Sequence, residues 1–472
     1  MDTIKVILIV LEVLLLFNLL IAVHELGHFL AAKWRGLKID RFAIWFGKPI
    51  WKKKIGGVEY ALGTIPAGGY VALPQMATME VIEGKGDTPV DQLPPISALD
   101  KIIVAVAGPL FSFLLAFAFA VIVWCVGKPE LTTKDSTLLG FVDPEGPAAA
   151  AGLQAGDEIL SIDGHDVHTF SPDRQDSITW RIITSENPTI SIKYSRDGHE
   201  ATAVVTPTNT PTKWYERKSL RQIFIRPALP LTIGEVTSNS PAALAGLQTN
   251  DEVVALNGQT IYSPVAWYFA ETNDPNKPVA FTIHRGGKEL KFSLTPEKPI
   301  KPKDADPSFG IAELAVDTNE SLSYPSPFEQ IHDSASMILA TIGAVSSPKV
   351  HVGVQQLGGP VMIIRAYKSF FESQNGWRRV LWFSVVLNVN LAMLNMVPFP
   401  VLDGGHILLA LIEAYRRRPV SAKLIQSIQT TCAVLLIAFM AYIMFFDTGD
   451  WIRSARKERN QDQPIEFAPP SK

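Results

Sequence analysis

The sequence predicts an α-helical polytopic membrane protein, with about four transmembrane helices and two β-rich domains inserted between the second helix and the third. Three observations predict this class. Apolar runs long enough to cross a bilayer occur only towards the two ends of the chain. The residues are 47% hydrophobic and only 19% charged, against about 25% charged in an ordinary soluble domain. A pattern that contains an alternating, strand-like run occurs twice in the middle of the chain.

The composition excludes other classes. With 43 Lys and Arg against 46 Asp and Glu, the net charge is −3, so the basic excess of a nucleic-acid-binding protein is missing and we expect no nucleic-acid partner. The two cysteines, Cys125 and Cys432, both lie in apolar runs, which excludes a disulfide framework and a thiolate zinc site. The 472 residues are too many for one compact core, so we expect several structural units.

Four segments have the length and apolarity of a transmembrane helix, which takes about 20 residues. They are residues 1–32, 98–127, 377–412 and 425–447. The apolar stretch of the first segment is too long for a cleaved signal peptide and is expected to remain as an anchor. The lipid bilayer is therefore an expected partner of the chain.

Basic residues near the ends of the spans predict the orientation, because short loops rich in Lys and Arg stay in the cytoplasm. Residues 33–97 and 413–424 carry such clusters, so both are expected to be cytoplasmic. The middle region and the tail, residues 448–472, are then expected on the opposite side. Basic residues before the third span and in the tail count against this orientation. Arg416, Arg417 and Arg418 are interpreted as a topology signal and not as a nucleic-acid site.

The middle region contains an internal repeat. Residues 146–164 and 240–258 share an Ala-rich turn, a Gly suited to a left-handed helix cap, an Asp, and a strand-like run that ends at another Gly. The repeats resemble paired PDZ domains, which we place at residues 128–220 and 221–300. Neither copy contains a recognisable catalytic group. Residues 301–376 are expected to form a linker and an amphipathic region at the membrane surface, although a soluble helix packed on the second PDZ domain explains the pattern nearly as well.

The first span contains ionisable residues, which are costly inside a membrane and usually functional there. His24 and His28 are four residues apart, so one helix face presents both imidazoles, with Glu25 beside them. Two imidazole nitrogens in this arrangement can bind Zn²⁺, and the carboxylate of Glu25 stays free to act as general base. On a soluble helix the same residues could equally form an exposed polar turn. Within an apolar span we interpret them as a metal site.

A catalytic zinc site normally has a third protein ligand. Asp403 is the candidate, because it follows Pro398 and Pro400, which lack backbone N–H groups and should break the third span. Irregular backbone inside a membrane is tolerated where it is buried or lines a cavity. Taken alone, Asp403 is better explained as a helix N-cap. The His pair favours the ligand role, and His406 is expected to be a cap or an outer group.

The order of these motifs resembles the site-2 protease family of intramembrane zinc metalloproteases, over nearly the whole chain. The motifs are H-E-x-x-H, Gly108-Pro109, the tandem repeats, Leu357-Gly358-Gly359-Pro360 and N-x-x-P-x-P-x-L-D-G-G. The resemblance implies Zn²⁺ as cofactor, with ligands His24, His28 and Asp403, and Glu25 as catalytic residue. It also implies Asn390 and Asn395 as substrate-binding residues. Two positions depart from the family pattern: Ser112 replaces an Asn, and a Gly-x-Gly loop reads Trp45-Phe46-Gly47.

Residues 59–73 contain two strand-like halves around Pro66, and we expect them to form a β-hairpin. An extended substrate could add to the edge of such a hairpin through main-chain hydrogen bonds. We therefore expect Gly68, Gly69 and Tyr70 to bind substrate. A simple cytoplasmic hairpin explains the pattern equally well, and the family resemblance favours a loop that re-enters the membrane.

The resemblance implies hydrolysis of a peptide bond in the transmembrane segment of single-span membrane proteins, in the bacterial inner membrane. The PDZ domains would lie in the periplasm, and the active site would open toward the cytoplasm. The implied substrate is an anti-sigma factor already shortened by another protease, with the PDZ pair acting as a size filter. The pair could instead recruit substrate termini. A non-enzymatic PDZ membrane adaptor is the competing class, but an adaptor does not explain why the His pair is joined by Asp403. A zinc transporter is the third class, but it would need polar groups along its path, and the second and fourth spans are almost uncharged.

Overall fold

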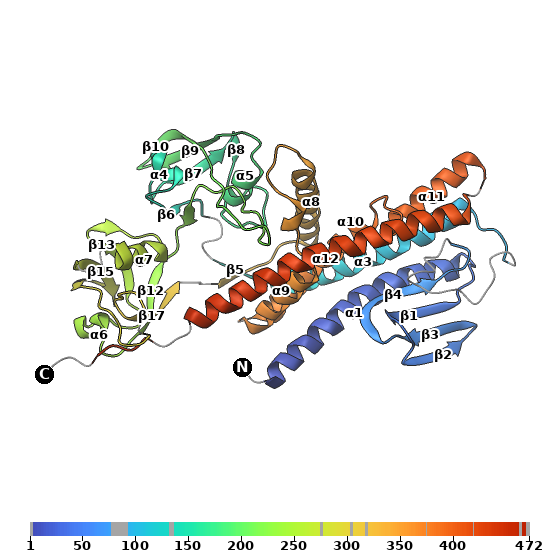
Figure 1. Ribbon diagram of the computed structural model, residues 1–472, viewed down its shortest axis with the longest axis horizontal. Helices are drawn as coiled ribbons and strands as arrows, with labels where there is room; N and C mark the ends of the chain where they lie inside the picture. The colour runs from blue at the N-terminus through green and yellow to red at the C-terminus, as the bar shows by residue number, and fades with distance from the viewer. Residues whose placement is uncertain are drawn as a thin grey trace. The chain divides into compact units, whose positions relative to one another are not determined.

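The computed structural model describes residues 3–76, 93–131, 136–273, 277–302, 305–316, 320–373, 375–418, 420–461 and 465–468. The chain divides into two compact units, which are described separately. The first consists of Met1–Pro129, Leu322–Leu339 and Leu357–Asp447, and contains most of the helical residues. The second consists of Glu130–Ser321, Ala340–Gln356 and Thr448–Lys472, and contains most of the strands (Figure 1).

Three helices in the described part of the chain are long and apolar enough to cross a membrane. They are α1 (Thr3–Trp34), α3 (Ala98–Val126) and α12 (Ala422–Gln461). They confirm three of the expected spans and an integral membrane protein. The apolar span of α12 runs from Lys423 to Arg456, and the helix itself continues to Gln461, so part of the expected tail is helical.

The expected third span consists of two helices, α10 (Gly376–Asn395) and α11 (Asp403–Arg416). The helix break predicted at Pro398 and Pro400 is confirmed, since neither proline can donate a backbone hydrogen bond. Helix α10 is not among the three apolar helices, because polar residues interrupt it. It contributes Val385 to a buried cluster with residues of α1 and α3, so part of its surface is covered by protein.

Two further helices belong wholly or partly to the first unit. They are α8 (Pro327–Ser346) and α9 (Pro360–Glu372). Helix α9 buries Tyr367, which packs against α1 and α10. The backbone N–H of Gly359, just before α9, donates to the Asp447 carboxylate of α12 at 3.0 Å. Within residues 301–376, the part expected to be amphipathic thus contains the two helices α8 and α9.

A four-stranded sheet follows α1 in the first unit. Its strands are β1 (Arg41–Phe46), β2 (Trp51–Ile55), β3 (Val58–Leu62) and β4 (Ile65–Ala72), in the order β2-β3-β1-β4. The predicted hairpin of residues 59–73 is wrong, because β3 pairs parallel with β1 and β4 pairs antiparallel with its other side. The short link at Gly63 crosses the end of β1, where its N–H donates to the Ile44 carbonyl. Strand β4 is an edge strand and packs against α1.

The second unit contains two hydrophobic cores, one for each copy of the repeat. The first core includes Ile223, and the second extends to Phe309. Strands around the first are β6 (Leu139–Val142), β7 (Glu158–Ile162), β8 (His165–Asp166), β9 (Ile190–Arg196), β10 (His199–Val205) and β11 (Ile225–Pro227), with helix α5 (Ile178–Thr184). Around the second are β12 (Leu231–Val236), β13 (Glu252–Leu256), β14 (Gln259–Thr260), β15 (Val279–Arg285), β16 (Lys288–Leu294) and β17 (Ile311–Val316), with helix α7 (Pro264–Asn273). A separate two-stranded sheet pairs β5 (Lys128–Leu131) with β18 (Glu320–Ser323).

The repeated pattern builds the same local structure twice. Short helices α4 (Pro147–Ala150) and α6 (Pro241–Ala245) each begin at the Pro of the pattern. The glycines that follow, Gly152 and Gly246, have φ of 87° and 89°. A residue with a Cβ is strained there, which confirms the predicted left-handed glycines.

The Asp of each copy holds its domain together. Asp157 and Asp251 are each about 1% exposed, and each accepts a hydrogen bond from the backbone N–H three residues before it. Each also binds an arginine through both carboxylate oxygens, Arg196 and Arg285 respectively. The same arginine donates to the carbonyl of the cap glycine. Each copy of the repeat therefore contains this Asp because its hydrogen bonds stabilise the fold of the domain.

Candidate metal centre

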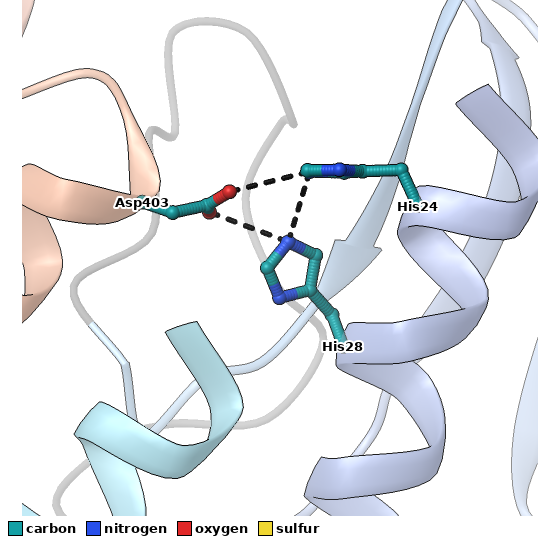
Figure 2. A group of neighbouring side chains, drawn as sticks. All are labelled: His24, His28 and Asp403. Carbon is teal, nitrogen blue, oxygen red and sulfur yellow. Dashed lines mark hydrogen bonds and ion pairs between the residues drawn. The ribbon is translucent and has the colours of Figure 1, made fainter. Parts of the chain in front are cut away.

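Three side chains predicted as ligands lie together in the first unit. His24 and His28 come from neighbouring turns of α1, and Asp403 is the first residue of α11 (Figure 2). The Nε2 atoms of the two histidines are 3.3 Å apart. The Asp403 carboxylate places Oδ2 3.2 Å from Nε2 of His24, and Oδ1 3.3 Å from Nε2 of His28. Two nitrogens and a carboxylate thus converge on one point.

The hydrogen bonds behind these side chains fit a bound cation. Nδ1 of His28 lies 2.8 Å from the Val104 carbonyl, to which only a protonated nitrogen can donate. In a neutral imidazole this leaves the lone pair on Nε2, toward the centre. Oδ2 of Asp403 is buried and accepts no hydrogen bond. The lone pair of His28 Nε2 and the carboxylate oxygens of Asp403 thus point toward one another and repel unless a cation lies between them. The three residues therefore fit Zn²⁺.

Ser112 forms a hydrogen bond with the other histidine, His24. Its side chain is fully buried on α3, and its Oγ lies 2.9 Å from Nδ1 of His24. A hydrogen bond to the far nitrogen of a histidine ligand fixes the tautomer and the direction of the ring. From the sequence, Ser112 was evident only as a departure from the family pattern. A small polar residue within an apolar span was the signal for this contact.

Two glycines allow α3 to pack directly on the His pair. A Cβ at Gly108 of α3 would lie 2.2 Å from Nε2 of His28 and 2.8 Å from Nε2 of His24. A Cβ at Gly27 of α1 would lie 2.3 Å from the Ala107 carbonyl oxygen. Both glycines appear in the sequence motifs, but their steric role depends on helix packing and was not predicted.

A cavity of about 290 Å³ lies over the centre. Among the predicted site residues, its walls include Glu25, Gly68, Gly69, Tyr70, Asn395 and all three predicted ligands. Nδ2 of Asn395 is 3.4 Å from Nε2 of His24. Asn390 is half-buried on α10 and does not line the cavity. His406 lines it, but lies outside the group formed by the two histidines and Asp403.

Strand β4 lies directly against the face of α1 that carries Glu25. A Cβ at Gly69 would lie 3.2 Å from Cγ of Glu25 and from Cγ2 of Ile21. Such contacts are tighter than side chains normally make, so a glycine here lets the strand edge reach the carboxylate. The edge strand and Glu25 therefore share one wall of the cavity.

An aromatic pair lies on the same wall. The Phe46 ring fills the space over Gly68, where a Cβ would lie 1.9 Å from Cε2 of Phe46. It also stacks on Tyr70, with ring centroids 6.0 Å apart and an interplanar angle of 2°. Its neighbour Trp45 has a φ of 70°, rare for a bulky residue, and donates its indole N–H to the Asn18 side chain of α1. The tripeptide was evident in the sequence as a departure from the family pattern, but a position of Phe46 in the site was not predicted.

Known proteins resemble the chain over most of its length. The model of peptidase family M50 matches residues 12–439. A Vibrio cholerae protein named as a predicted zinc metalloprotease is 30% identical over 461 residues, covering 91% of this chain and 96% of that protein. The regulators of sigma-E protease of Salmonella typhimurium and Escherichia coli K12 are each 26% identical, over 449 and 450 residues, with the same coverage. The family match includes His24, His28 and Asp403.

Proposed function

The chain belongs to peptidase family M50 and is a zinc metalloprotease, and from this premise we propose that it cleaves peptide bonds within the transmembrane segments of membrane proteins. One observation carries the proposal. Two of the three ligands, His24 and His28, lie within the apolar span Ile7–Trp34. A substrate must then be cut where that span lies in the bilayer.

We propose that His24, His28 and Asp403 hold the zinc ion. When bound, zinc lowers the pKa of water and polarises the scissile carbonyl. Glu25, on the cavity wall, accepts the proton of the attacking water and returns it to the leaving amine. The side-chain amide of Asn395 lies beside His24 at the centre. From there it can donate a hydrogen bond to the scissile carbonyl oxygen, which becomes negatively charged during the reaction. Asn390 does not line the cavity, so its role in binding substrate rests on the family resemblance alone.

A transmembrane substrate must also lose its helical structure before cleavage, because its carbonyls are engaged in hydrogen bonds along the helix. We propose that the unwound segment pairs with the edge of β4. Main-chain pairing of this kind tolerates different side chains. Gly69 keeps the strand close to α1, Gly68 leaves room for the Phe46 ring, and Tyr70 with Phe46 would contact the substrate side chains.

The test separates metal binding from catalysis. His24→Ala, His28→Ala and Asp403→Ala should each lower the zinc content of the purified protein and abolish cleavage. Glu25→Gln should keep zinc and abolish cleavage of a transmembrane substrate. Full activity in Glu25→Gln would contradict the mechanism. Unchanged zinc content in all three ligand variants, with no cleavage by the parent protein, would favour the membrane adaptor.

We further propose a location and a substrate class. The chain would lie in a bacterial inner membrane, with α10 and α11 as a further crossing, the repeat domains in the periplasm and the site open to the cytoplasm. Cysteines placed at Gln154 and Gln248 should then react with an impermeant reagent in spheroplasts, whereas one at Lys53 should not. The reverse labelling would overturn this orientation.

On the family resemblance we propose a single-span anti-sigma factor, shortened by another protease, as the substrate. The names of the two sigma-E relatives agree with a link to a sigma factor and say no more. In this proposal the β-rich repeats are PDZ domains that exclude substrates with a large outer domain. Gly152→Asp and Gly246→Asp would disturb them at left-handed glycines. Both variants should then cut a full-length substrate without prior trimming. Loss of activity on the shortened substrate, with a raised KM and no gain on the long one, would show recruitment instead.

A further inference from the structure

We propose that the loop of residues 209–221, named here the aromatic loop, rests on the surface of the lipid bilayer through Trp214. The loop lies between the repeat domains of the second unit. Backbone hydrogen bonds in both directions between Thr208 and Gln222 close its base, at 2.9 Å each. The loop is thus a defined projection, and its function is not part of the proteolytic site.

The side chains of the aromatic loop have the composition of a membrane interface. Trp214 is 86% exposed, although an indole is favourably transferred out of water. It packs edge-on against Tyr215, with ring centroids 5.5 Å apart, and Lys213 lies over the Tyr215 ring at 5.7 Å. Trp and Tyr are enriched where bilayer and water meet, and a lysine beside them can reach lipid phosphates.

The loop is tied to the end of a membrane-spanning helix. Arg217 donates through Nε to the Asp450 carboxylate of α12. The adjoining Lys218 accepts a hydrogen bond on its carbonyl from Gln356 at 2.6 Å. Asp450 lies inside the apolar span Lys423–Arg456, close to its end. Contact with Asp450 therefore places the loop at the level where α12 leaves the hydrocarbon.

The same end of α12 also carries exposed aromatic, apolar and basic side chains. Trp451 and Ile452, which follow Asp450, are 47% and 48% exposed. Arg453 binds Asp450 from the helix itself, so the carboxylate joins two cations at this level. The aromatic loop thus extends an aromatic and basic belt that α12 begins. Because the loop and the end of α12 share this composition, we expect the exposed indole of Trp214 to contact lipid and not a protein partner.

The experiment uses the full chain in vesicles of phosphatidylethanolamine and phosphatidylglycerol. Cys125 and Cys432 are replaced by alanine, and an environment-sensitive dye is attached at Trp214→Cys. The matched control carries the dye at Val204→Cys, an apolar residue on β10 that is 64% exposed. The dye at position 214 should emit at shorter wavelength and be quenched by lipids with a nitroxide near the headgroup. The dye at position 204 should show neither effect.

Adding Arg217→Gln should weaken the quenching at position 214, because the loop loses its ion pair with Asp450, while zinc content stays unchanged. Two results would overturn the proposal. The first is equal quenching of both positions by a water-soluble reagent, with none by the lipid nitroxide. The second is protection of position 214 only when a protein partner is added. Quenching that is unaffected by Arg217→Gln would refute the role of α12 in placing the loop.

Discussion

Replacing Gly108 by alanine should remove zinc from the centre by adding a single methyl group. The new Cβ would lie 2.2 Å from Nε2 of His28, the atom that faces the metal. On an ordinary helix the same change would be favourable, because alanine is about 1 kcal/mol better than glycine in a helix interior. Here packing against α1 reverses the expected sign.

The size of the effect follows from the geometry. A Cβ essentially never approaches another heavy atom closer than 3.0 Å, so Nε2 of His28 must move by at least 0.8 Å from its 2.2 Å contact. Zinc ligand distances vary by only about 0.2 Å. The shift exceeds this tolerance about fourfold, and His24 must also move. Loss of an outer hydrogen bond alone lowers metal affinity about 10–100-fold, so displacing a ligand should lower it by about 100-fold or more.

Zinc affinity would be measured by competition with a chelator, together with cleavage of a transmembrane substrate. Gly343→Ala is the matched control, since it lies in helix α8 and its added Cβ meets no atom within 4 Å. That variant should keep zinc affinity and activity. If the zinc affinity of Gly108→Ala stayed within about twofold of that of the parent, the steric reasoning would be refuted. The helices or side chains would then have shifted to accept the methyl group without disturbing the ligands.

Three further predictions concern other contacts. Ser112→Ala should lower zinc affinity about 10–100-fold because His24 loses the partner of its Nδ1 atom, whereas Ser112→Asn should bind zinc better than the alanine variant; equal affinities in a chelator titration would contradict this. Asp251→Asn should destabilise the second β domain by about 1–3 kcal/mol, since it weakens hydrogen bonds to a charged arginine. Denaturant unfolding of the intact protein, monitored by tryptophan fluorescence, measures the change, and an unchanged midpoint would contradict the reasoning. Gly359→Ala should speed proteolysis at the start of α9, because its Cβ would lie 2.7 Å from Oδ2 of Asp447; a cleavage rate equal to that of the parent would argue against the contact.

Patterns of short range were readable from the sequence by itself. The spacing of His24 and His28 puts both on one face of a helix in any fold, because the period of the helix is local. Pro398 and Pro400 interrupt a helix wherever they occur, since they lack a backbone donor. The repeated glycines and aspartates likewise predicted two similar β-rich domains. Peptide geometry dictates each of these features without help from distant residues.

Features that depend on packing between distant segments were decided only by the tertiary structure. The sequence proposed Asp403 as a ligand only through its combination with the His pair, and the two come together because α11 and α1 both pack against α3. The strand order β2-β3-β1-β4 replaced the expected hairpin, since pairing partners are chosen by the whole sheet. Gly108, Ser112 and Phe46 gained their roles in the same way. Their side chains, or the absence of one, matter only because a segment far away in the chain fills the adjoining space.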